Sequence, residues 1–316
     1  MHSSGGEGTD KCAGSTTSLR RHPVSDSPAR STDDPGLGLV SIVTPSYNQG
    51  KFLESTIRSV LGQSYPHIEY LVCDGGSQDS TVDIIKRYSD RLAWWCSESD
   101  RGQSDAINKG WRRSTGQILA YLNSDDVLLP GAVDRAVRAF HESPSTGVVY
   151  GDWIYLDEEG TELGLGLGRP TDFKLLLRDG QGHCVAQPAS FYRADVVRQV
   201  GLIDESLHYS MDYDLLLRLA KVSQMRYLPF ALAGYRVHMS AKTSEFSRHH
   251  WIETLAVRAR YGGRYLSKQR LRYWCYRALA AVPDSFQMWF RGVRNSSKDW
   301  AALRAAAVRR GRKPNL

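Results

Sequence analysis

The chain has 316 residues, of which 41% are hydrophobic and 24% charged, so it is long enough to bury a core and is composed like a globular protein. It has no apolar run near the roughly 18–20 residues of a membrane-spanning helix and no apolar signal-peptide centre, so we expect a soluble, non-secreted protein. The net charge of +7 suits nucleic acid, anionic lipid or a phosphorylated substrate, and charge alone does not separate these partners.

The first part of the chain differs in character from the remainder. Residues 1–36 are mostly Ser, Gly, Thr, Asp and Arg with almost no apolar side chains. Such a composition cannot offset the entropy of ordering, so we expect a disordered leader there. From Leu39 onward, short apolar runs alternate with amphipathic segments, which is typical of strands alternating with helices.

The alternation predicts the order of the first elements. Four short apolar runs are the predicted strands, at residues 39–43, 68–72, 92–96 and 118–122. Three amphipathic segments between them are the predicted helices, at residues 52–61, 81–88 and 104–113. Strands and helices alternating in this way indicate a mostly parallel α/β sheet covered on both faces, with ligands at the carboxyl ends of its strands.

Each predicted strand is followed by a polar cluster. The four clusters are Thr44–Asn48, Cys73–Ser77, Ser97–Asp100 and Asn123–Asp126. Because parallel strands end at the same edge of a sheet, we expect the four clusters to converge there.

The second half of the chain has a mixed pattern. We expect a hairpin that turns at Asp157–Gly160, and later helices over residues 194–200 and 212–221, in a region that shapes the site of a second substrate. Beyond about Arg258, Arg and Lys alternate with aromatic and aliphatic residues, which indicates a basic amphipathic tail.

The segment Asn123-Ser-Asp-Asp126 is a candidate metal site. Two adjacent carboxylates at a strand end supply the oxygen ligands that Mg²⁺ or Mn²⁺ requires and leave positions for substrate phosphates. The alternative is that Asp126 only caps a helix that begins near Pro130, since Asp is common at helix starts.

Asp212 is the candidate general base. It stands at the start of a predicted helix, where its carboxylate can face a cleft and accept a proton from an alcohol. The alternative is that Asp212 or Asp214 caps the helix and complements its dipole, and for Asp214 we favour that structural role.

Two further segments have an ordinary structural interpretation from their residues alone. Asp105 and Lys109 lie one turn apart on a predicted helix, where Lys109 can either reach a phosphate or pair with Asp105. His238 follows a likely strand end and suits a metal ligand, a phosphate donor or a packed histidine. Without further context, a capped surface helix and a packed histidine are the expected cases.

Several classes of protein lack their sequence signatures here. The five cysteines are odd in number, widely spaced and without a Cys-x-x-Cys pair, so they encode neither a disulfide framework nor a zinc knuckle and fit a reducing compartment. Gly164–Gly168 lacks the spacing of a dinucleotide-binding loop, and no Walker-type loop or Gly-x-Ser-x-Gly elbow is present.

Four motifs together resemble the family-2 glycosyltransferases of GT-A fold. They are Val43–Asn48, Asp74–Thr81, Asn123–Asp126 and Met211–Arg218, and their order and spacing carry the resemblance from about Leu39 to Ser244. It implies a GT-A type, Rossmann-like sheet flanked by helices, with an acceptor-side subregion, while the leader and the basic helical tail lie outside the resemblance. The expected divisions are a domain at residues 37–245, its nucleotide-sugar half at 37–130 and acceptor half at 131–245, and a tail at 246–316.

The resemblance also implies roles for single residues on the donor side. The residues that would line the nucleotide base and ribose are Thr44, Pro45, Ser46 and Tyr47. Asp74 would accept a hydrogen bond from the base, and Asp105 and Lys109 would border the nucleotide.

The same resemblance implies that Asp125 ligates the metal, that His238 completes the metal or diphosphate site, and that Asp212 is the base. The sequence departs from the family where Asn123 replaces the first carboxylate of the usual Asp-x-Asp; with Ser124 it would contact the nucleotide-sugar, and Asn123 can still bind a ribose hydroxyl. One fewer negative charge should weaken metal affinity. Met211 stands where many relatives carry an acidic residue, which alters the surroundings of the base.

We therefore expect an inverting glycosyltransferase that uses Mg²⁺ or Mn²⁺ and moves a sugar from a nucleotide-sugar, with uridine donors foremost and thymidine and guanosine donors open. The expected acceptor is a glycan or a lipid-linked sugar in cell-surface polysaccharide or glycolipid synthesis. The expected location is the cytoplasm, with the basic tail contacting the inner leaflet of the plasma membrane.

Two other classes compete with this interpretation. A sugar-phosphate nucleotidyltransferase also binds nucleotides on a related sheet, but the chain lacks a Gly-rich, Arg-bearing loop after its first strand. A non-catalytic nucleic-acid-binding protein accounts for the basic tail but not for the acidic strand ends, so we expect no nucleic-acid partner.

Overall fold

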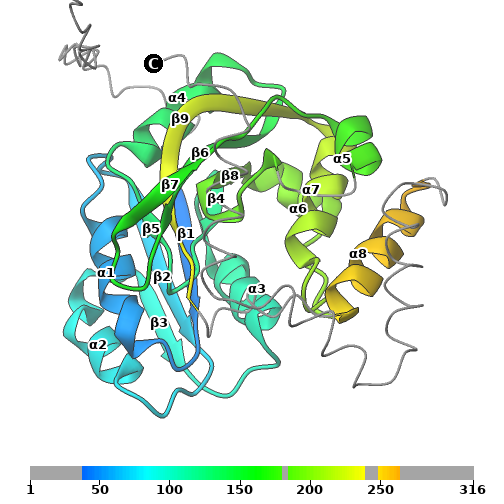
Figure 1. Ribbon diagram of the computed structural model, residues 1–316. Coiled ribbons are helices and arrows are strands. Elements are labelled where there is room, and N and C mark those ends of the chain that lie inside the picture. The colour runs from blue at the N-terminus through cyan, green and yellow to red at the C-terminus, as the bar shows by residue number, and fades with distance from the viewer. Residues whose placement is uncertain (1–37, 180–183, 239–247, 264–316) are drawn as a thin grey trace, which may run out of the picture.

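The computed structural model describes residues 38–179, 184–238 and 248–263, and the predicted leader and most of the predicted tail lie outside them. One curled mixed sheet runs through the molecule, with helices on both of its faces (Figure 1). The strand order is β3-β2-β1-β4-β8-β6-β9-β5, and β7 pairs with β6 outside this path.

The first four strands form a parallel set, as the sequence predicted. They are β1 (Val40–Ser46), β2 (Ile68–Asp74), β3 (Trp94–Ser97) and β4 (Ile118–Tyr121). β1 lies in the centre, paired with β2 on one side and β4 on the other, and all of its residues are buried. A strand covered on both faces is built mainly from apolar residues, which explains why β1 is largely apolar before Thr44.

Helices cover the two faces of this parallel set. The helices around it are α1 (Gly50–Leu61), α2 (Thr81–Arg87), α3 (Gln103–Arg113) and α4 (Ala132–Glu142). α1, α2 and α4 pack in one core cluster with Ile42, whereas α3 packs in the other cluster with Val43. Because neighbouring residues of a strand face opposite sides, β1 contributes to both cores.

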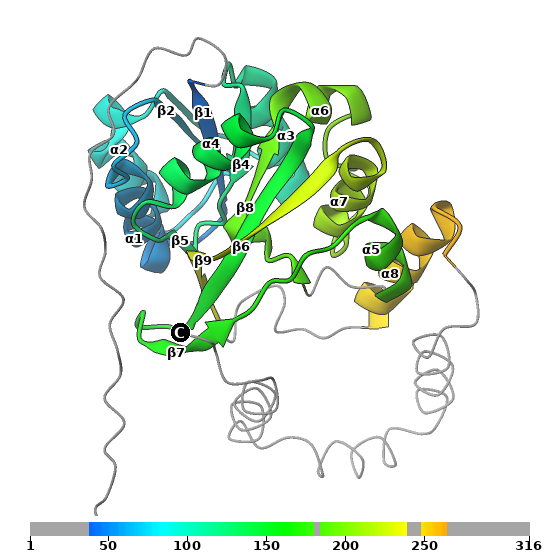
Figure 2. The ribbon, with the colours of Figure 1, turned by 90° about the horizontal axis from the view of Figure 1, so that it is seen from above.

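The second half adds strands of both directions. Its elements are β5 (Val127–Leu128), β6 (Thr146–Leu156), β7 (Glu162–Gly166), α5 (Phe173–Asp179), β8 (Ser190–Arg193), α6 (Ala194–Val200), α7 (Met211–Val222), β9 (Gln224–Arg236) and α8 (Arg248–Arg260). β8 is antiparallel to β4 and β6, and β6 runs parallel to β9 (Figure 2). The predicted hairpin joins β6 and β7, and its Gly164–Gly168 segment begins within strand β7, in line with rejecting a phosphate loop.

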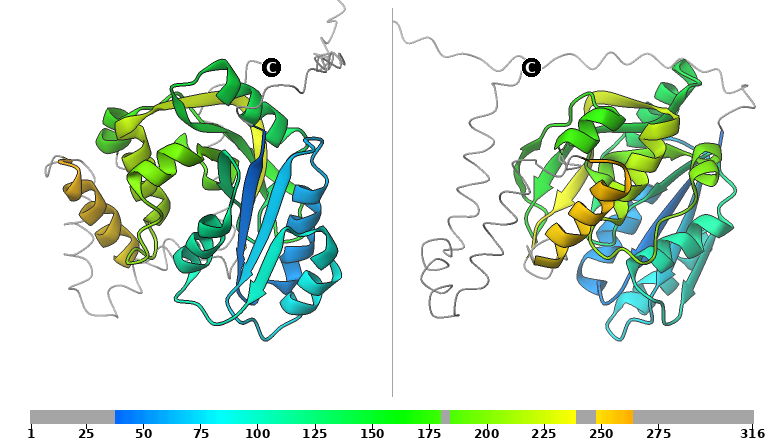
Figure 3. Two further views of the ribbon diagram at one scale, coloured as in Figure 1. Left: turned by 180° about the vertical axis from the view of Figure 1, so that it is seen from behind. Right: turned by 90° about the vertical axis from the view of Figure 1, so that its right-hand side faces the viewer.

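Helix α8 begins just after the predicted boundary at residue 245 and packs against α7 (Figure 3). Val257 belongs to the same core cluster as α7, and the Arg258 guanidinium donates to the carbonyl of Leu177 at 2.7 Å. Among the helices of the described ranges, none is long and apolar enough to cross a membrane. The rest of the predicted basic tail lies outside the described residues.

One close approach gives a test of the helix–sheet packing. A Cβ at Gly110 of α3 would lie 2.5 Å from Cγ1 of Val43 in β1, and Val43 is a buried branched side chain that cannot turn away. Gly110→Ala should lower the free energy of unfolding by about 1–2 kcal/mol, because overpacking outweighs the gain in helix propensity. Urea denaturation measures this change.

The control is Gly38→Ala, where the added Cβ meets no heavy atom within 4 Å. The double variant Val43→Ala/Gly110→Ala should lose less free energy of unfolding than the two single variants together. The smaller side chain at residue 43 leaves room for the new methyl group at residue 110, which in turn fills part of the space left by Val43. Strict additivity would show that the close approach does not limit the packing.

Candidate functional site

The loops after β1 and β2 are joined to each other at the carboxyl edge of the sheet. The backbone N–H of Asn48 donates to Oγ of Ser77 at 2.7 Å, and the backbone N–H of Gln78 donates to Oδ1 of Asn48 at 2.8 Å. Asn48 has a left-handed φ of 52°, a conformation that Asn tolerates better than most residues. The first two polar clusters therefore form one rigid ledge, as the convergence of strand ends predicts.

The residues predicted to line the base and ribose differ in exposure. Thr44 is buried and its hydroxyl lies 3.0 Å from that of Tyr70, while Pro45 is also buried. The Ser46 hydroxyl is buried and finds no hydrogen-bond partner among the described residues. Tyr47 is 60% exposed. A ligand on the ledge can therefore meet Tyr47 directly and satisfy the hydroxyl of Ser46.

Asp74 is 1% exposed and organises the ledge from inside. Its carboxylate accepts hydrogen bonds from the backbone N–H groups of Gly76 and Ser77 at 3.1 and 3.0 Å, and from the Ser97 hydroxyl at 2.6 Å. The hydroxyl of Ser77 donates to the other carboxylate oxygen. Since a carboxylate has about four acceptor positions, these contacts occupy Asp74 with its own loops.

Asp105 and Lys109 both form ion pairs, though not with each other. Asp105 accepts from the Arg101 guanidinium at 3.0 Å, and this contact holds the pKa of the Asp105 carboxyl below its usual range. Lys109 pairs with Glu98 at 2.7 Å, which raises the pKa of the Lys109 ammonium. The helix they share begins beside the loop after β3, so the two residues lie at the same edge as the ledge.

The loop after β4 is held by hydrogen bonds from α1 and from two glutamine side chains. The hydroxyl of Thr56 in α1 donates to the carbonyls of Ser124 and Asp126 at 2.9 and 2.7 Å. The Asn123 side chain accepts from Gln103 at 2.7 Å and donates to Gln187 at 3.1 Å. Ser124 is buried, so its backbone rather than its hydroxyl meets the neighbouring helix.

Asp126 is 1% exposed, and its Oδ1 accepts the backbone N–H of Arg236 at 2.8 Å. Burial raises the pKa of this carboxyl strongly, and the neighbouring Asp125 adds to the effect. The helix α4 starts only at Ala132, with Gly131 as its N-cap, so Asp126 does not cap it. Asp126 instead fixes the end of β9 against the loop after β4.

The carboxylate of Asp125 contacts His238 instead. Its Oδ2 lies 3.1 Å from Nε2 of His238, whose ring is buried against the ring of Phe52. The Arg236 guanidinium donates to the backbone carbonyl of Asp125 at 2.8 Å and to the carbonyls of Asp157 and Glu158. The carboxylate and imidazole are thus brought together by residues from two distant parts of the chain.

The donor chemistry of this pair fits a divalent cation that takes its other ligands from a phosphate. One carboxylate oxygen and one imidazole nitrogen converge, and both are ligands for Mn²⁺-type metals. Within the described ranges, His, Cys, Asp and Glu form no group of three or more that could hold a metal. Among the described residues, this pair is therefore at most part of a ligand set, and a cation held there would need further oxygen ligands.

Asp212 lies in the first turn of α7, half-buried, with Oδ1 accepting the backbone N–H of Tyr213 at 2.7 Å. Burial raises the pKa of Tyr121 and Tyr192, and the charge of Asp212 contributes to both shifts. The charge of Asp126 also acts on Tyr121, the last residue of β4. Asp212 therefore lies close to the strand end from which the Asp125 loop departs.

Asp214 has a structural role, although it is not the helix cap that the sequence favoured, because Ser210 is the N-cap of α7. It is buried, accepts from the Arg218 guanidinium at 2.8 Å, and accepts from the hydroxyl of Tyr261 at 2.8 Å. These contacts tie α7 to itself and to the segment after α8. Asp214 is therefore held by structural contacts, and Asp212 is the acidic residue of α7 whose charge acts on Tyr121 at the end of β4.

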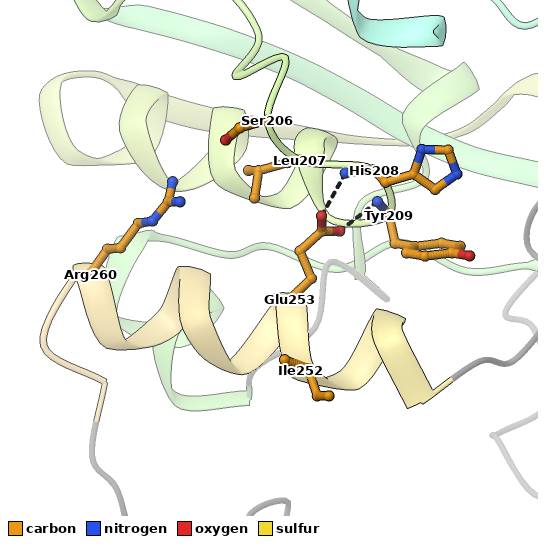
Figure 4. Close-up of a pocket in the computed structure, with 7 residues that line it drawn as sticks. All are labelled: Ser206, Leu207, His208, Tyr209, Ile252, Glu253 and Arg260. Atoms are coloured by element: carbon orange, nitrogen blue, oxygen red, sulfur yellow. Dashed lines mark hydrogen bonds between the residues drawn. The ribbon is translucent and has the colours of Figure 1, made fainter.

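Sequence reasoning missed Arg236 and Glu253. Arg236 stands two residues before His238, and its burial could have been suspected only from its place in an apolar strand. Glu253 of α8 accepts the backbone N–H groups that precede α7, and no sequence pattern connects these segments (Figure 4). A pocket of about 440 Å³ lies between them, and its lining residues are Ser206, Leu207, His208, Tyr209, Ile252, Glu253 and Arg260.

Residues 41–201 match the family described as glycosyl transferase family 2, which is half of the chain. The chain belongs to this family. It therefore carries a glycosyltransferase domain, and the predicted relationship is confirmed.

Curated relatives agree with this assignment. An uncharacterised glycosyltransferase of Nostoc is 26% identical over 262 residues, which cover 74% of this chain and 80% of the relative. One from Mycobacterium tuberculosis is 33% identical over 190 residues, 58% of this chain and 70% of the relative. The match to a Rickettsia conorii relative, at 26% identity over 67% of this chain, spans only 36% of that protein's length.

Solved structures show the same fold. The chain aligns with Staphylococcus aureus TarS 1–349 in complex with UDP-GlcNAc at a TM-score of 0.59 and 14% identity, covering 74% of this chain and 71% of the other. It aligns with the mannosyltransferase PcManGT from Pyrobaculum calidifontis in complex with GDP-Man and Mn²⁺ at a TM-score of 0.56 and 18% identity, covering 90% and 85%. The predicted GT-A fold is confirmed.

The contacts of Asp74 lead to a test of the ledge. Asp74→Asn should lower the free energy of unfolding by about 1–3 kcal/mol, because the amide NH₂ faces donors and leaves buried N–H groups unsatisfied. Chemical denaturation measures the change. Asp83→Asn, at an exposed carboxylate in the first turn of α2, should stay within about 0.5 kcal/mol of the parent. Equal effects at the two positions would contradict an organising role for Asp74.

Proposed function

We propose that this protein transfers a sugar from a nucleotide-sugar to an acceptor hydroxyl in a single displacement that inverts the anomeric configuration. The observation that carries the proposal is the arrangement at the end of β4. Asp125 follows this strand, His238 reaches its carboxylate from the end of β9, and the charge of Asp212 acts on Tyr121, the last residue of β4. A partial metal-ligand set and a half-buried carboxylate base at one strand end suit displacement of a diphosphate by an alcohol.

The donor nucleotide would bind on the ledge formed by the loops after β1 and β2. Tyr47 is exposed there, and the Ser46 hydroxyl, which has no partner in the described ranges, can donate to or accept from the ribose or base. Thr44, Pro45 and Asp74 would support the ledge from beneath, given their burial. The remaining proposed contacts come from the neighbouring loops: Asp105, Lys109, Asn123 and Ser124.

Asp125 and His238 would hold Mg²⁺ or Mn²⁺, which when bound neutralises charge on the leaving nucleoside diphosphate. The Arg236 guanidinium donates to the backbone carbonyl of Asp125 and so fixes the backbone from which the Asp125 carboxylate extends. Asn123 contributes an amide instead of a second carboxylate, and this amide is already bonded to Gln103 and Gln187. We therefore expect weaker metal binding than a pair of carboxylates provides.

Asp212 would act on the acceptor. Its carboxylate accepts the proton of the acceptor hydroxyl while that oxygen forms a bond to the anomeric carbon of the donor sugar. The bond between that carbon and the diphosphate oxygen breaks, and its electron pair leaves with the nucleoside diphosphate. Attack from the face opposite the leaving group inverts the configuration without a covalent intermediate on the protein.

The base assignment predicts a selective loss of turnover. Asp212→Asn should lower kcat by about 10²–10⁴-fold, because the amide cannot accept the proton. Binding of the donor nucleotide should change little, since Asp212 acts on the acceptor. Steady-state release of nucleoside diphosphate and calorimetric titration with the nucleotide measure the two quantities.

The matched control is Asp195→Asn, at an exposed carboxylate in the first turn of α6. It removes an acidic residue from the same position of another helix and should leave kcat unchanged. A kcat for Asp212→Asn within twofold of the parent would rule out the carboxylate as the base.

The metal assignment predicts a change in cation affinity that can be read without turnover. Asp125→Ala should weaken Mn²⁺ binding in the presence of UDP by at least about 10-fold, because it removes one of two protein ligands. Calorimetry or electron paramagnetic resonance of Mn²⁺ measures the affinity, with the exposed Asp90→Ala as control. Unchanged Mn²⁺ affinity would place the cation elsewhere.

The donor and the class of reaction are decided by product analysis. The TarS and PcManGT structures contain UDP-GlcNAc and GDP-Man, so both uridine and guanosine sugars belong in the donor panel, with uridine sugars our first choice. Release of a nucleoside diphosphate with formation of a glycoside would support transfer. Release of pyrophosphate would instead support a nucleotidyltransferase. We propose a glycan or lipid-linked acceptor in cell-surface polysaccharide or glycolipid synthesis, with the basic tail at the inner leaflet.

A further inference from the structure

Helix α8 holds the loop that leads into α7. The Glu253 carboxylate accepts the backbone N–H groups of His208 and Tyr209, both at 2.5 Å (Figure 4). It also accepts that of the next residue, Ser210, at 2.7 Å. Hydrogen bonds to an ionised carboxylate are shorter and stronger than neutral ones. Three consecutive amides that donate to one carboxylate fix the position and the backbone conformation of the loop.

A second contact from α8 strengthens this hold. The hydroxyls of Ser210 and Thr254 lie 2.8 Å apart, and both residues are buried. Ser210 is the N-cap of α7, yet its side chain makes no capping hydrogen bond to the helix. The N-cap hydroxyl, which ordinarily satisfies the first turn, is turned toward α8 instead.

The start of α7 is also fixed from the opposite side. The hydroxyl of Ser104 in α3 donates to the sulfur of Met211 at 2.7 Å. Asp212 therefore follows a residue pinned by α3 and a residue pinned by α8. Its backbone has little freedom, so the direction of its carboxylate depends on where these two helices hold the loop.

His250 shows that Asp212 and the capping face of α8 are neighbours. Burial lowers the pKa of His250, while the charges of Asp212 and Glu253 both oppose that shift. Both carboxylates are therefore near the same imidazole, one turn of α8 before Glu253. The ring of His250 also stacks on that of Tyr209, whose backbone N–H Glu253 accepts.

We propose that Glu253 is a positioning residue for Asp212, and that α8 sets the carboxylate toward the end of β4 through the loop at residues 208–210. This inference rests on the proposed role of Asp212 as the base. It assigns to a helix beyond the matched residues 41–201 a part in the chemistry. A displacement of about 1 Å in a reacting group can cost on the order of 100-fold in rate, so a loosened loop should reduce turnover without touching the donor.

The experiment compares Glu253→Gln, Glu253→Asp and Ile252→Ala in the full chain. Glu253→Gln removes the charge at nearly constant size, and Glu253→Asp keeps the charge on a shorter side chain. Ile252 is the preceding residue of α8, 38% exposed in the same pocket, and serves as the matched control. The readouts are amide hydrogen exchange at residues 208–210, affinity for UDP, and kcat and KM for transfer.

With Glu253→Gln we expect faster exchange at the three amides, a kcat lowered by about 10–100-fold, and a nucleotide affinity within about twofold of the parent. Glu253→Asp should recover part of the lost kcat, and Ile252→Ala should match the parent. Faster exchange with unchanged kcat would overturn the positioning role. Unchanged exchange would overturn the hold itself.

If Glu253→Gln does not fold, Thr254→Val removes the contact with Ser210 alone and should produce a smaller fall in kcat. An unchanged kcat in that variant would then count against the proposal. The proposed function and the contact between α8 and the loop are tested separately. A parent protein that turns over no donor would overturn the proposed function, and with it the positioning role, whereas the exchange data would still decide whether α8 holds the loop.

Discussion

The buried carboxylate of Asp126 is the contact on which the site depends. By accepting the backbone N–H of Arg236, it fixes the end of β9 beside the loop after β4, across 110 residues of sequence. The Arg236 side chain then returns to the backbone of Asp125, and His238 two residues later reaches the Asp125 carboxylate. The pairing of β5 with β9, Val127 opposite Gly234, holds the same two segments together, so the contact of Asp126 completes an alignment that the sheet begins.

The adjacent Asp125 and Asp126 differ in burial and in their partners. A buried charge is costly unless it is hydrogen-bonded, and burial correspondingly raises the pKa of Asp126. Asp125 stays partly exposed, with its carboxylate 3.1 Å from the imidazole of His238. A similar difference in burial is found on the ledge, where Asp74 is buried and hydrogen-bonded to neighbouring loops while Tyr47 is exposed. In both places the buried residue fixes the loop on which the more exposed residue stands.

Much of the donor half could be predicted from the sequence, because its determinants are local. Apolar runs bounded by polar clusters predicted β1 to β4 and their parallel order, and the convergence of the strand ends followed from topology. The sequence favoured a structural role for Asp214, but as a helix cap; its contact with Tyr261 after α8 could not be read from its position in the helix. The rest depends on contacts between distant segments. The pairing of Lys109 with Glu98 instead of Asp105, the clamp of Arg236 and the cap by Glu253 all join residues that no spacing rule connects.

The second half of the sheet, with α7 and α8, is built differently, and on the proposed function this bears on how substrate choice is encoded. The match to the family ends at residue 201, before Asp212, His238 and Glu253. The ledge proposed to bind the donor is thus part of the matched domain, whereas the position of Asp212, the proposed base, relies on α7 and α8, which are held by contacts outside the matched residues. If Asp212 is the base, such a domain can keep its nucleotide chemistry while the helices around this carboxylate vary. On the proposed mechanism, the acceptor would then be selected in the segment that positions Asp212, so that a change of acceptor and a change in turnover are physically coupled.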